Sequence, residues 1–411
     1  MTADAHPRDS DTTSWPTTSL EDLCNAGEAF TTCGYVDEEM TDSAPGVVSS
    51  TYVKEGRISA PRDNERATAE LSRPRTVLEE GDLAVVLVRR VGDSALVTSE
   101  HAGWPASRSI GIIRAEPHIL QWLHIWLQTH TAKARIAEDV SAHVEPTVSL
   151  HTLRRMPFPL PSAPVIARYH EAFSLIEEMT ALYGRLARKT VELADVLHEE
   201  YSASTPRPET RPLKKVARLK TGKGAERSLT VSPTGSGVDV IAPQDLYDRP
   251  VPHVHRFRLS GPPDAGEVHG PDTLMLSTRP DGAHIAVSRR SAIALRSVVA
   301  LRPLAEEDVW WLLHELRSRS REIAESGQGE RRREISARAL KGLVITWPDR
   351  HARADFHRVA ESLHATSRLL VSKIATLRAL RDALLHDIAA KAGILRKPTD
   401  GEETGSSQLT V

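Results

Sequence analysis

Hydrophobic residues recur at alternating intervals of three and four through two long stretches of the chain. Residues 164–203 contain one glycine and no proline after Pro164, and residues 352–392 contain neither. This heptad spacing is typical of coiled-coil helices. The residues that follow it are Leu175, Met179, Leu182, Leu186, Leu193 and Val196 in the first stretch, and Leu363, Leu370, Leu377, Leu380, Leu384 and Ile388 in the second.

A helix of about 40 residues is about 60 Å long, at a rise of 1.5 Å per residue. One small domain cannot cover an apolar stripe of that length. We therefore expect the two helices to pack against each other in one chain, antiparallel, as a stalk. The alternative is that a helix from another chain covers each stripe.

A segment of short apolar runs, broken by glycine and proline, precedes each long helix. Runs of strand length and composition lie at 77–90, 109–114, 272–279 and 297–302. A short helix is expected at 117–129 and again at 305–318. Its tryptophans are expected in the core, and they are Trp122, Trp126, Trp310 and Trp311. A last strand closes each segment, and proline ends it because proline cannot donate to a ladder.

The order of these elements is repeated along the chain. Residues 81–98 align with 271–288 at an offset of 190, which matches Asp82 with Asp272 and Arg89 with Arg279. Ordered similarity at a nearly constant offset indicates a duplication with a unit of about 190 residues.

The expected fold class is α+β, with two tandem mixed α/β domains separated by two long antiparallel coiled-coil helices. A Pro-rich polar stretch, STPRPETRP, is typical of a linker between the halves. The expected boundaries are a disordered acidic tail at 1–18, a first domain at 19–161, a helix at 162–203, a linker at 204–212, a second domain at 213–348, a helix at 349–396 and a disordered tail at 397–411.

Length and composition narrow the class of protein. The chain has 411 residues and two cysteines, Cys24 and Cys33, with no apolar run of 18 residues and no basic and apolar N-terminal signal. We expect a soluble, cytoplasmic protein without a disulfide framework. Residues 1–46 carry ten acids and one base, whereas the other residues carry 52 basic and 45 acidic side chains, a net charge of +7. This asymmetry permits a polyanion partner.

Motifs for catalysis and cofactor binding are missing from the sequence. Neither N-P-P-[YF] nor D-P-P-[YF] occurs, so there is no catalytic loop of an amino-methyltransferase. F-x-G-x-G and G-x-S-x-G are missing as well, and His253 and His255 form an isolated pair without further metal ligands. We expect no catalytic residue, no cofactor and no metal.

The doubled order of globular segment and long helix resembles the specificity subunit of type I restriction-modification systems. GDLAVVLVRR (81–90) and DTLMLSTR (272–279) are similar to a strand of that family, and SLHTLRRMPFPLP (149–161) to the end of its recognition domains. LEDL (20–23) and LKKVARLKTGKG (213–224) open the two halves, where the family has an apolar turn and a Gly-rich loop. The Glu-Gln pair that usually follows the Pro-rich strand is missing, which suits a member that works with a methyltransferase alone.

The resemblance implies a non-catalytic subunit with two target recognition domains. Each domain would contact one half-site of a bipartite target in double-stranded DNA, and the helices would set the spacing. The implied partners are adenine DNA methyltransferase subunits and, where the system cleaves DNA, a restriction and translocase subunit. The alternative function is a protein-binding scaffold or adaptor with duplicated domains and a coiled-coil stalk.

Candidate DNA contacts are basic residues at strand ends and in loops. Lysine and arginine neutralise phosphates, and arginine is the commonest side chain on guanine in the major groove. For the arginines, a salt bridge at a domain edge is the competing interpretation. The candidates are Arg89, Arg90, Lys220, Lys223, Arg279, Arg331, Arg332 and Arg333.

Overall fold

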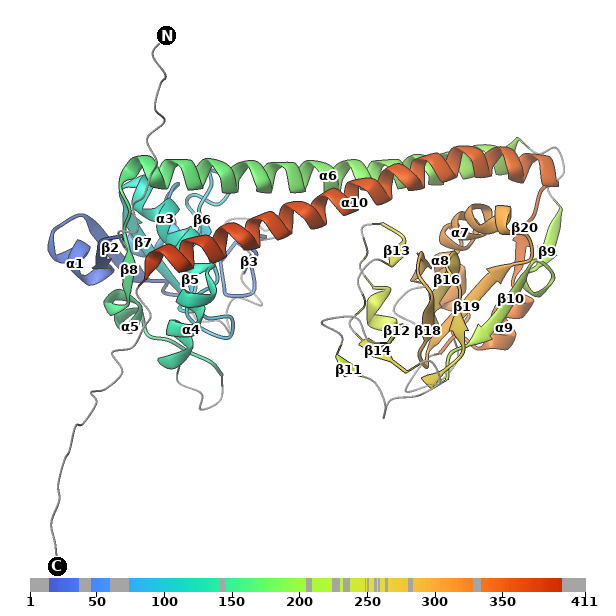
Figure 1. Cartoon of the computed structure of the whole chain (residues 1–411), viewed down its shortest axis with the longest axis horizontal. Helices are drawn as coiled ribbons and strands as arrows, with labels where there is room; N and C mark the ends of the chain where they lie inside the picture. The colour runs from blue at the N-terminus through green and yellow to red at the C-terminus, as the bar shows by residue number, and fades with distance from the viewer. Residues whose placement is uncertain are drawn as a thin grey trace, which may run out of the picture. The chain divides into compact units, whose positions relative to one another are not determined.

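Two long helices run through both halves of the fold in this computed structural model. Helix α6 spans Ala163–Ala203 and α10 spans Arg350–Ala392 (Figure 1). The chain divides into two units, with Met1–Glu177 and Arg378–Val411 in unit 1 and Glu178–Leu377 in unit 2, so each helix belongs in part to each unit. The structure describes residues 15–36, 46–59, 74–140, 145–204, 209–223, 230–231, 237–247, 249, 251–254, 257, 259–262, 265–279, 284–327 and 334–393.

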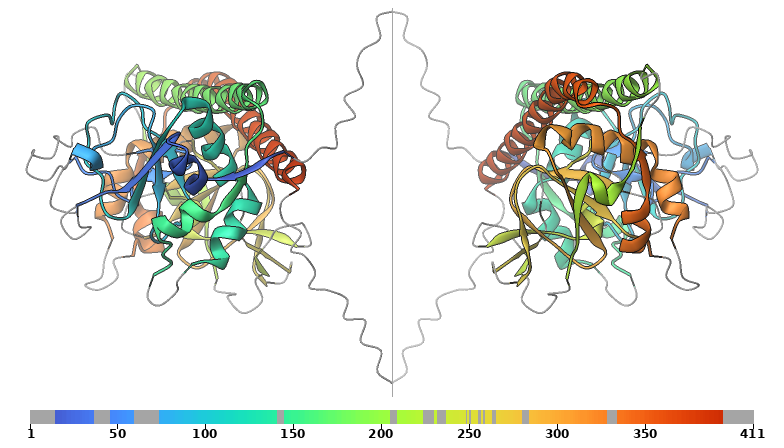
Figure 2. Two further views of the ribbon diagram at one scale, coloured as in Figure 1. Left: turned by 90° about the vertical axis from the view of Figure 1, so that its left-hand side faces the viewer. Right: turned by 90° about the vertical axis from the view of Figure 1, so that its right-hand side faces the viewer.

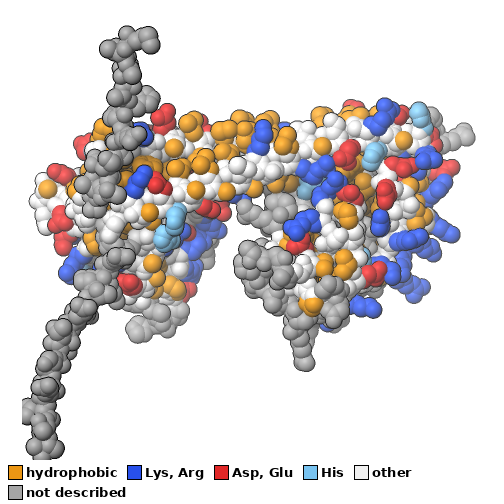
Figure 3. All heavy atoms as spheres, viewed as in Figure 1, with side chains coloured by type: hydrophobic (Ala, Val, Ile, Leu, Met, Phe, Trp, Pro, Cys, Tyr) orange, Lys and Arg blue, Asp and Glu red, His pale blue; other side chains and the backbone are white. Residues whose placement is uncertain are grey.

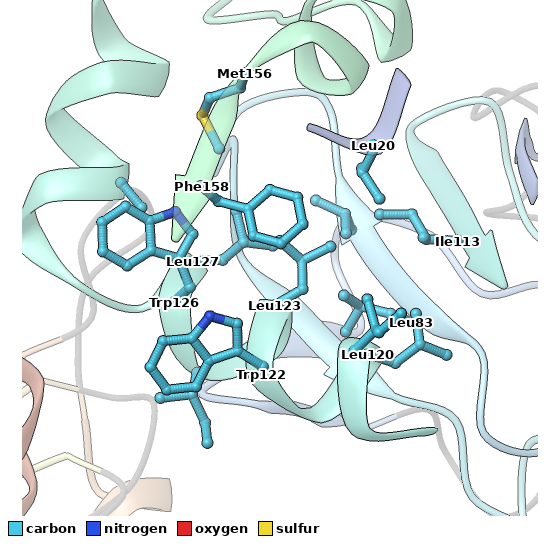
Figure 4. Close-up of a cluster of buried hydrophobic side chains, with 14 of the residues drawn as sticks. Leu20, Leu83, Ile113, Leu120, Trp122, Leu123, Trp126, Leu127, Met156 and Phe158 are labelled. Atoms are coloured by element: carbon cyan, nitrogen blue, oxygen red, sulfur yellow. The ribbon is translucent and has the colours of Figure 1, made fainter. Parts of the chain in front are cut away.

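Unit 1 is built on a four-stranded antiparallel sheet with the strand order β2-β7-β5-β6. Its elements are β1 (Thr17–Ser19), α1 (Leu20–Asn25), β2 (Ala29–Cys33), β3 (Val53–Lys54), β4 (Arg57–Ile58), η2 (Pro74–Thr76), β5 (Leu83–Val86), β6 (Ser94–Leu96), β7 (Ile110–Ala115), α3 (Pro117–Leu127), α4 (His130–Glu138), α5 (Leu150–Arg155) and β8 (Pro157–Pro159). Alternate strand residues face α3, and Trp122, Trp126 and Phe158 fill the core with Leu20 and Leu83 (Figure 4).

Unit 2 repeats this sheet and adds a strand, in the order β10-β19-β16-β17-β13. Helix α7 lies across it (Figure 2). Its Trp310 and Trp311 are fully buried. The elements are β9 (Thr210–Pro212), η3 (Leu213–Lys215), β10 (Ala217–Thr221), β13 (His253–Val254), β16 (Thr273–Ser277), β17 (Ile285–Ser288), β19 (Val298–Pro303), η6 (Glu306–Asp308), α7 (Val309–Ser318), α8 (Ser320–Glu325), α9 (Ala337–Gly342) and β20 (Val344–Thr346).

A second sheet of five strands, in the order β11-β14-β12-β18-β15, lies in unit 2 and was not expected from the sequence. Its elements are β11 (Thr230–Val231), β12 (Val238–Ile241), η4 (Pro243–Asp245), β14 (Leu259–Gly261), β15 (Val268–His269) and β18 (Ala292–Ala294). These strands are short, and most of their sequence lacks the alternation that marks a strand.

The long helices run antiparallel within each unit, as expected. In unit 1, Tyr169 donates to Asp387 at 2.8 Å. In unit 2, Ser367 donates to the carbonyl of Ala187 at 3.2 Å, and the Lys373 ammonium lies 5.4 Å from the centre of the Tyr183 ring. Residue numbers fall on α10 as they rise on α6, which fixes the direction.

The expected apolar seam of α6 is wrong. Its large side chains are exposed, by 44% at Leu182 and 48% at Leu193, and they form an apolar ridge (Figure 3). This α6 ridge comprises Leu175, Met179, Leu182, Leu186, Leu193 and Val196. The covered stripe holds Phe173, Ile176, Ala187, Val191 and Ala194 instead. Small alanines allow the two helix backbones to approach closely, and a pattern search for large apolar residues passes over them.

Two expected boundaries also differ. Trp15 packs edge-on against Trp122, with ring centres 5.2 Å apart, and β1 pairs with β8, so residues 15–18 belong to the fold and not to a tail. Strand β9 pairs with β20, so the expected linker contains a strand. No helix among the described residues is both long and apolar enough to cross a membrane.

Candidate nucleic-acid interface

A glycine turn occupies the same place in both units, directly after β2 and directly after β10. A Cβ atom at Gly222 would lie far inside contact distance of the carbonyl oxygens of Leu295 and Ala294. Gly34 meets the main chain in the same way, and the two glycine N–H groups donate to Ile110 and Val298, each at 2.9 Å. Only glycine fits such an approach of two backbones.

Each glycine turn presents an exposed side chain beside an exposed arginine. In unit 1, the Arg108 guanidinium lies 5.9 Å from the centre of the Tyr35 ring and its Nε donates to the Tyr35 carbonyl at 3.3 Å. In unit 2, Lys223 and Arg296 line one hollow of 640 Å³. In the repeat, Lys223 corresponds to Tyr35 and Arg296 corresponds to Arg108, each at an offset of 188 residues. An aromatic ring, an ammonium and two guanidinium groups are suitable contacts for nucleic acid.

The hollow of unit 2 also holds a carboxylate, because Glu334 lies on its wall. The Ser297 hydroxyl donates to Glu334 at 2.5 Å, and Ser297 itself has a left-handed φ of 67°. The Glu334 carboxylate is therefore hydrogen-bonded to Ser297, and it lines the same hollow as Lys223 and Arg296.

The expected lysines lie on one strand and its turn. Lys220 is exposed on β10 and its Nζ is 3.4 Å from Glu267, whereas Lys223 is exposed at the hollow. Arg279 is exposed just after β16, and its main-chain N–H bonds to the Ser277 hydroxyl at 3.3 Å. Among the described residues, no carboxylate pairs with the side chains of Lys223 and Arg279. These two remain available for phosphate or base contacts.

Arg89 and Arg90 are tied to their own unit. Arg89 has a left-handed φ of 68° and its Nε pairs with Glu145 at 3.0 Å. Arg90 donates to the carbonyls of Ser50 and Val53 and pairs with Asp93. Arg90 therefore holds a loop in place through its guanidinium. Arg331, Arg332 and Arg333 lie outside the described residues.

The strand pairing gives the repeat an offset that is one residue larger than the offset of 190 in the sequence alignment. Leu83 pairs with Ile113, and Leu274 pairs with Leu301, so the repeat of β5 in β16 has an offset of 191. Arg279 then corresponds to Val88, and Arg89 is not its counterpart. The residues just before Val88 and Arg279 confirm the shift. The Leu87 carbonyl accepts from the Val148 N–H, and the Thr278 carbonyl accepts from the Ile335 N–H. The sequence alignment missed it because the two halves differ in loop length.

A row of buried, hydrogen-bonded polar side chains joins four elements of unit 2. His253 Nε2 lies 3.1 Å from His364 Nδ1, His364 Nε2 lies 2.9 Å from His314 Nε2, and His314 Nδ1 lies 2.6 Å from Asp195. Because an ionised carboxylate only accepts, His314 Nδ1 donates to Asp195. With neutral rings, His364 then donates to His314 and His253 donates to His364. We call this set the histidine chain. It ties β13, α7 and α10 to α6.

Burial sets the titration of the histidine chain. It lowers the pKa of His314 and of His364 below the ordinary histidine value, and the neighbouring His314 and His253 lower that of His364 further. Burial alone would raise the pKa of Asp195, yet hydrogen bonds from His314 and Arg317 hold it below its usual range. Among the described residues, no three His, Cys, Asp or Glu side chains are arranged to hold a metal ion.

No protein-family model matches the sequence, and no curated protein sequence matches it. Among solved structures, the S subunit of a type I restriction-modification system from M. genitalium aligns with a TM-score of 0.54 and 11% identity, over 93% of this chain and 97% of that chain. The chain has the fold of a type I restriction-modification S subunit.

Two further solved structures of the same class align less well. The HsdS subunit from Thermoanaerobacter tengcongensis gives a TM-score of 0.36 at 19% identity, over 93% of this chain and 97% of that chain. A chain from work on the assembly and conformational transition of the type I R-M system gives 0.47 at 18%, over 91% and 97%. The expected α+β class, with paired mixed domains and two long helices, is confirmed for the S-subunit fold.

Three residues at the turns of the S-subunit fold were not among the candidates from the sequence, namely Tyr35, Arg108 and Arg296. Arg108 and Arg296 stand directly after the loop that each glycine approaches. The signal that could have found them is the pair Gly34 and Gly222, whose offset of 188 also relates the two arginines. It was overlooked because TCGY and TGKG share little beyond the glycine.

Proposed function

We propose that the chain is the sequence-specific DNA-binding subunit of a type I restriction-modification or methyltransferase-only complex. Each unit contacts one half of a bipartite target in double-stranded DNA, the target recognition domains being residues 19–161 and 213–348. The long helices, within 162–203 and 349–396, set the spacing of the halves. The chain positions adenine methyltransferase subunits and, where present, a restriction and translocase subunit.

The observation that carries this function is the duplicated unit with unlike contact residues. Both units have the same sheet order around the same glycine turn. The turns present Tyr35 with Arg108 in one unit and Lys223 with Arg296 in the other. One scaffold with two different sets of side chains suits a target of two different half-sites, because base contacts specify sequence while phosphate contacts position the protein.

The α6 ridge supports the partner part of the proposal. Its members lie at heptad positions a and d, yet α10 leaves them exposed. A heptad stripe on an exposed helix face fits a helix of another chain. We assign that helix to the methyltransferase subunit, which the proposed function requires as a stable partner.

The chain is proposed to have no catalytic activity of its own. The described residues offer no cluster for a metal, and the sequence lacks the motifs of a methyltransferase. Methyl transfer should require both this chain and a modification subunit. The test is incorporation of labelled methyl groups into DNA by each protein alone and by the mixture.

Exchange of residues 213–348 for the corresponding segment of another specificity subunit is expected to change one half-site and leave the other unchanged. The core of unit 1 lies outside the exchanged segment and stays intact, whereas the core of unit 2 also uses Phe356 and Ala360 of α10, so the donor segment must come from a subunit with matching residues there. The measurement is methylation-site profiling of the reconstituted complex. A scaffold without base contacts would give methylation sites that do not change with the graft, and that result would exclude the proposed function.

Arg279→Ala is expected to relax one base position of the half-site that unit 2 contacts, at a cost of about 1–3 kcal/mol in binding, because a bidentate arginine contact to guanine has that value. Selection from a randomised duplex library measures it. Arg358→Ala on α10 is the control, since that side chain is 77% exposed and pairs with Asp355. An unchanged selected sequence for Arg279→Ala would remove Arg279 from the base contacts.

A further inference from the structure

Unit 2 carries a basic face that unit 1 lacks. The face lies where η3, the start of β10, the end of β19 and α9 meet. Its six exposed side chains are Lys214, Lys215, Arg218, Arg302, Arg338 and Lys341. Figure 3 shows Lys and Arg side chains gathered on the flank of unit 2 where Figure 1 labels β9, β10 and α9.

Two arginines of the basic face are direct neighbours in the sheet. Arg218 on β10 and Arg302 on β19 are opposed in the antiparallel register. Side chains at such positions have Cβ atoms about 4.5–5.5 Å apart, and like charges there destabilise the sheet. An anion that bridges the two guanidinium groups removes this repulsion.

Acidic side chains do little to neutralise the basic face. Arg302 pairs with Glu306, which is itself 88% exposed, at 3.2 Å. Within the described part of the chain, no carboxylate lies at ion-pair distance from the other five cations. Their charge therefore remains available to a ligand in solution.

The corresponding surface of unit 1 shows that the fold does not require the charges of η3, β10 and β19, although α5, in the place of α9, keeps Arg154 and Arg155, the latter 3.8 Å from Glu21. Leu20-Glu21-Asp22-Leu23 corresponds to Leu213-Lys214-Lys215-Val216, so two acids stand where unit 2 has two lysines. Phe30 takes the place of Arg218 in the matching register, and Arg114 that of Arg302. Arg114 is neutralised by Asp82 at 2.9 Å and Glu79 at 3.0 Å.

We infer that the basic face binds the phosphate backbone of duplex DNA without regard to sequence, as a contact additional to the base-reading turns. The inference rests on the proposed function for the identity of the polyanion. Six cations on two strands, a turn and a short helix suit the repeated phosphates of a duplex, where each neutralised phosphate releases counterions. Because only unit 2 has the face, the contact lies beside one half-site alone.

The test uses the full chain and a 60-base-pair duplex of random sequence. The triple variant Lys214→Gln, Lys215→Gln and Arg218→Gln is expected to bind about tenfold more weakly at 150 mM salt. The slope of log affinity against log salt concentration should fall by about 2.7, at about 0.9 for each lost phosphate contact. A second variant, Arg338→Gln with Lys341→Gln, should shift both quantities in the same direction.

The control removes three charges from exposed positions of α6, as Arg185→Gln, Arg188→Gln and Lys189→Gln. It should keep the parent affinity and slope. If both face variants bind the random duplex like the parent, the inference is wrong, even if their retention on heparin falls. If the control loses as much as the face variants, net charge explains the result and the inference is wrong as well.

The outcomes separate this inference from the proposed function. Suppose the parent chain selects a bipartite target and the face variants bind random duplex as the parent does. That result would overturn the inference about the basic face and leave the proposed function standing. A face-dependent affinity for random duplex, without any sequence selection by the reconstituted complex, would support the face and overturn the proposed function.

Discussion

Lowering the pH from 7 to 5 is expected to destabilise the fold by about 2 kcal/mol through His364, and His314 adds to the loss in the same direction. Both rings are neutral in the folded state because burial lowers their pKa values. In the unfolded chain they take up protons as the pH falls through the ordinary histidine value of 6.5. The stability that neutrality provides is therefore complete above that pH and is lost below it.

Urea unfolding at the two pH values, followed by tryptophan fluorescence, measures this loss. The Trp310 ring stacks 4.0 Å from His364, so the probe lies beside the titrating group. Asp195 has its pKa held below the usual aspartate range and stays charged throughout, so it does not contribute to the slope.

His364→Gln should reduce the pH dependence by about 2 kcal/mol, because one buried titrating group has been removed. It should also lower stability at pH 7, since the histidine chain is broken. His351→Gln is the matched control, with a side chain that is 89% exposed on the same helix. Equal stability of the parent at both pH values would contradict the assignment of neutral rings.

Gly222→Ala is expected to destabilise the chain by about 3 kcal/mol or more, at the upper end of the effect of overpacking. The added methyl group meets the carbonyl oxygens of Leu295 and Ala294, and backbone atoms cannot move aside as a flexible side chain can. The measurement is the shift of the urea midpoint at constant slope. DNA binding should weaken as well, because the turn carries Lys223.

Gly184→Ala provides the opposite control. Gly184 lies inside α6 with nothing within 4 Å of an added Cβ. Alanine there should stabilise the helix by about 0.5–1 kcal/mol, because glycine loses more backbone entropy on folding. Were the Gly222 and Gly184 variants to unfold at the same urea concentration, the close approach at Gly222 would not constrain the turn.

The sequence is informative where a pattern is long and repeated. The long helices, the core tryptophans and the duplicated order of strands and helices follow from spacings that extend over many residues, such as the run from Leu175 to Val196. The buried face of α6 could not be predicted, because that helix has two apolar stripes and only packing decides which one α10 covers. Ala187 and Ala194, on the covered stripe, do not stand out by hydrophobicity.

The candidate interface was predictable only in part. Lys223 was found because a glycine-rich loop is visible in the sequence, and Arg279 because it ends a strand. Arg296 and Arg108 follow unremarkable loops, and their position depends on a backbone approach that only the folded chain makes. The basic face unites η3 and α9, which lie more than a hundred residues apart. The histidine chain likewise draws its members from four distant elements.

If a partner covers the α6 ridge, as proposed, the amount of this chain that a cell can hold in a well-behaved form depends on the amount of that partner. Any molecule produced in excess carries an uncovered row of large apolar side chains, of which Leu193 is nearly half exposed. Two such rows can cover each other, so surplus copies have a driving force for self-association. Balanced output of the two genes and assembly during synthesis would both keep the row hidden. The same feature makes co-expression the practical route to a well-behaved preparation.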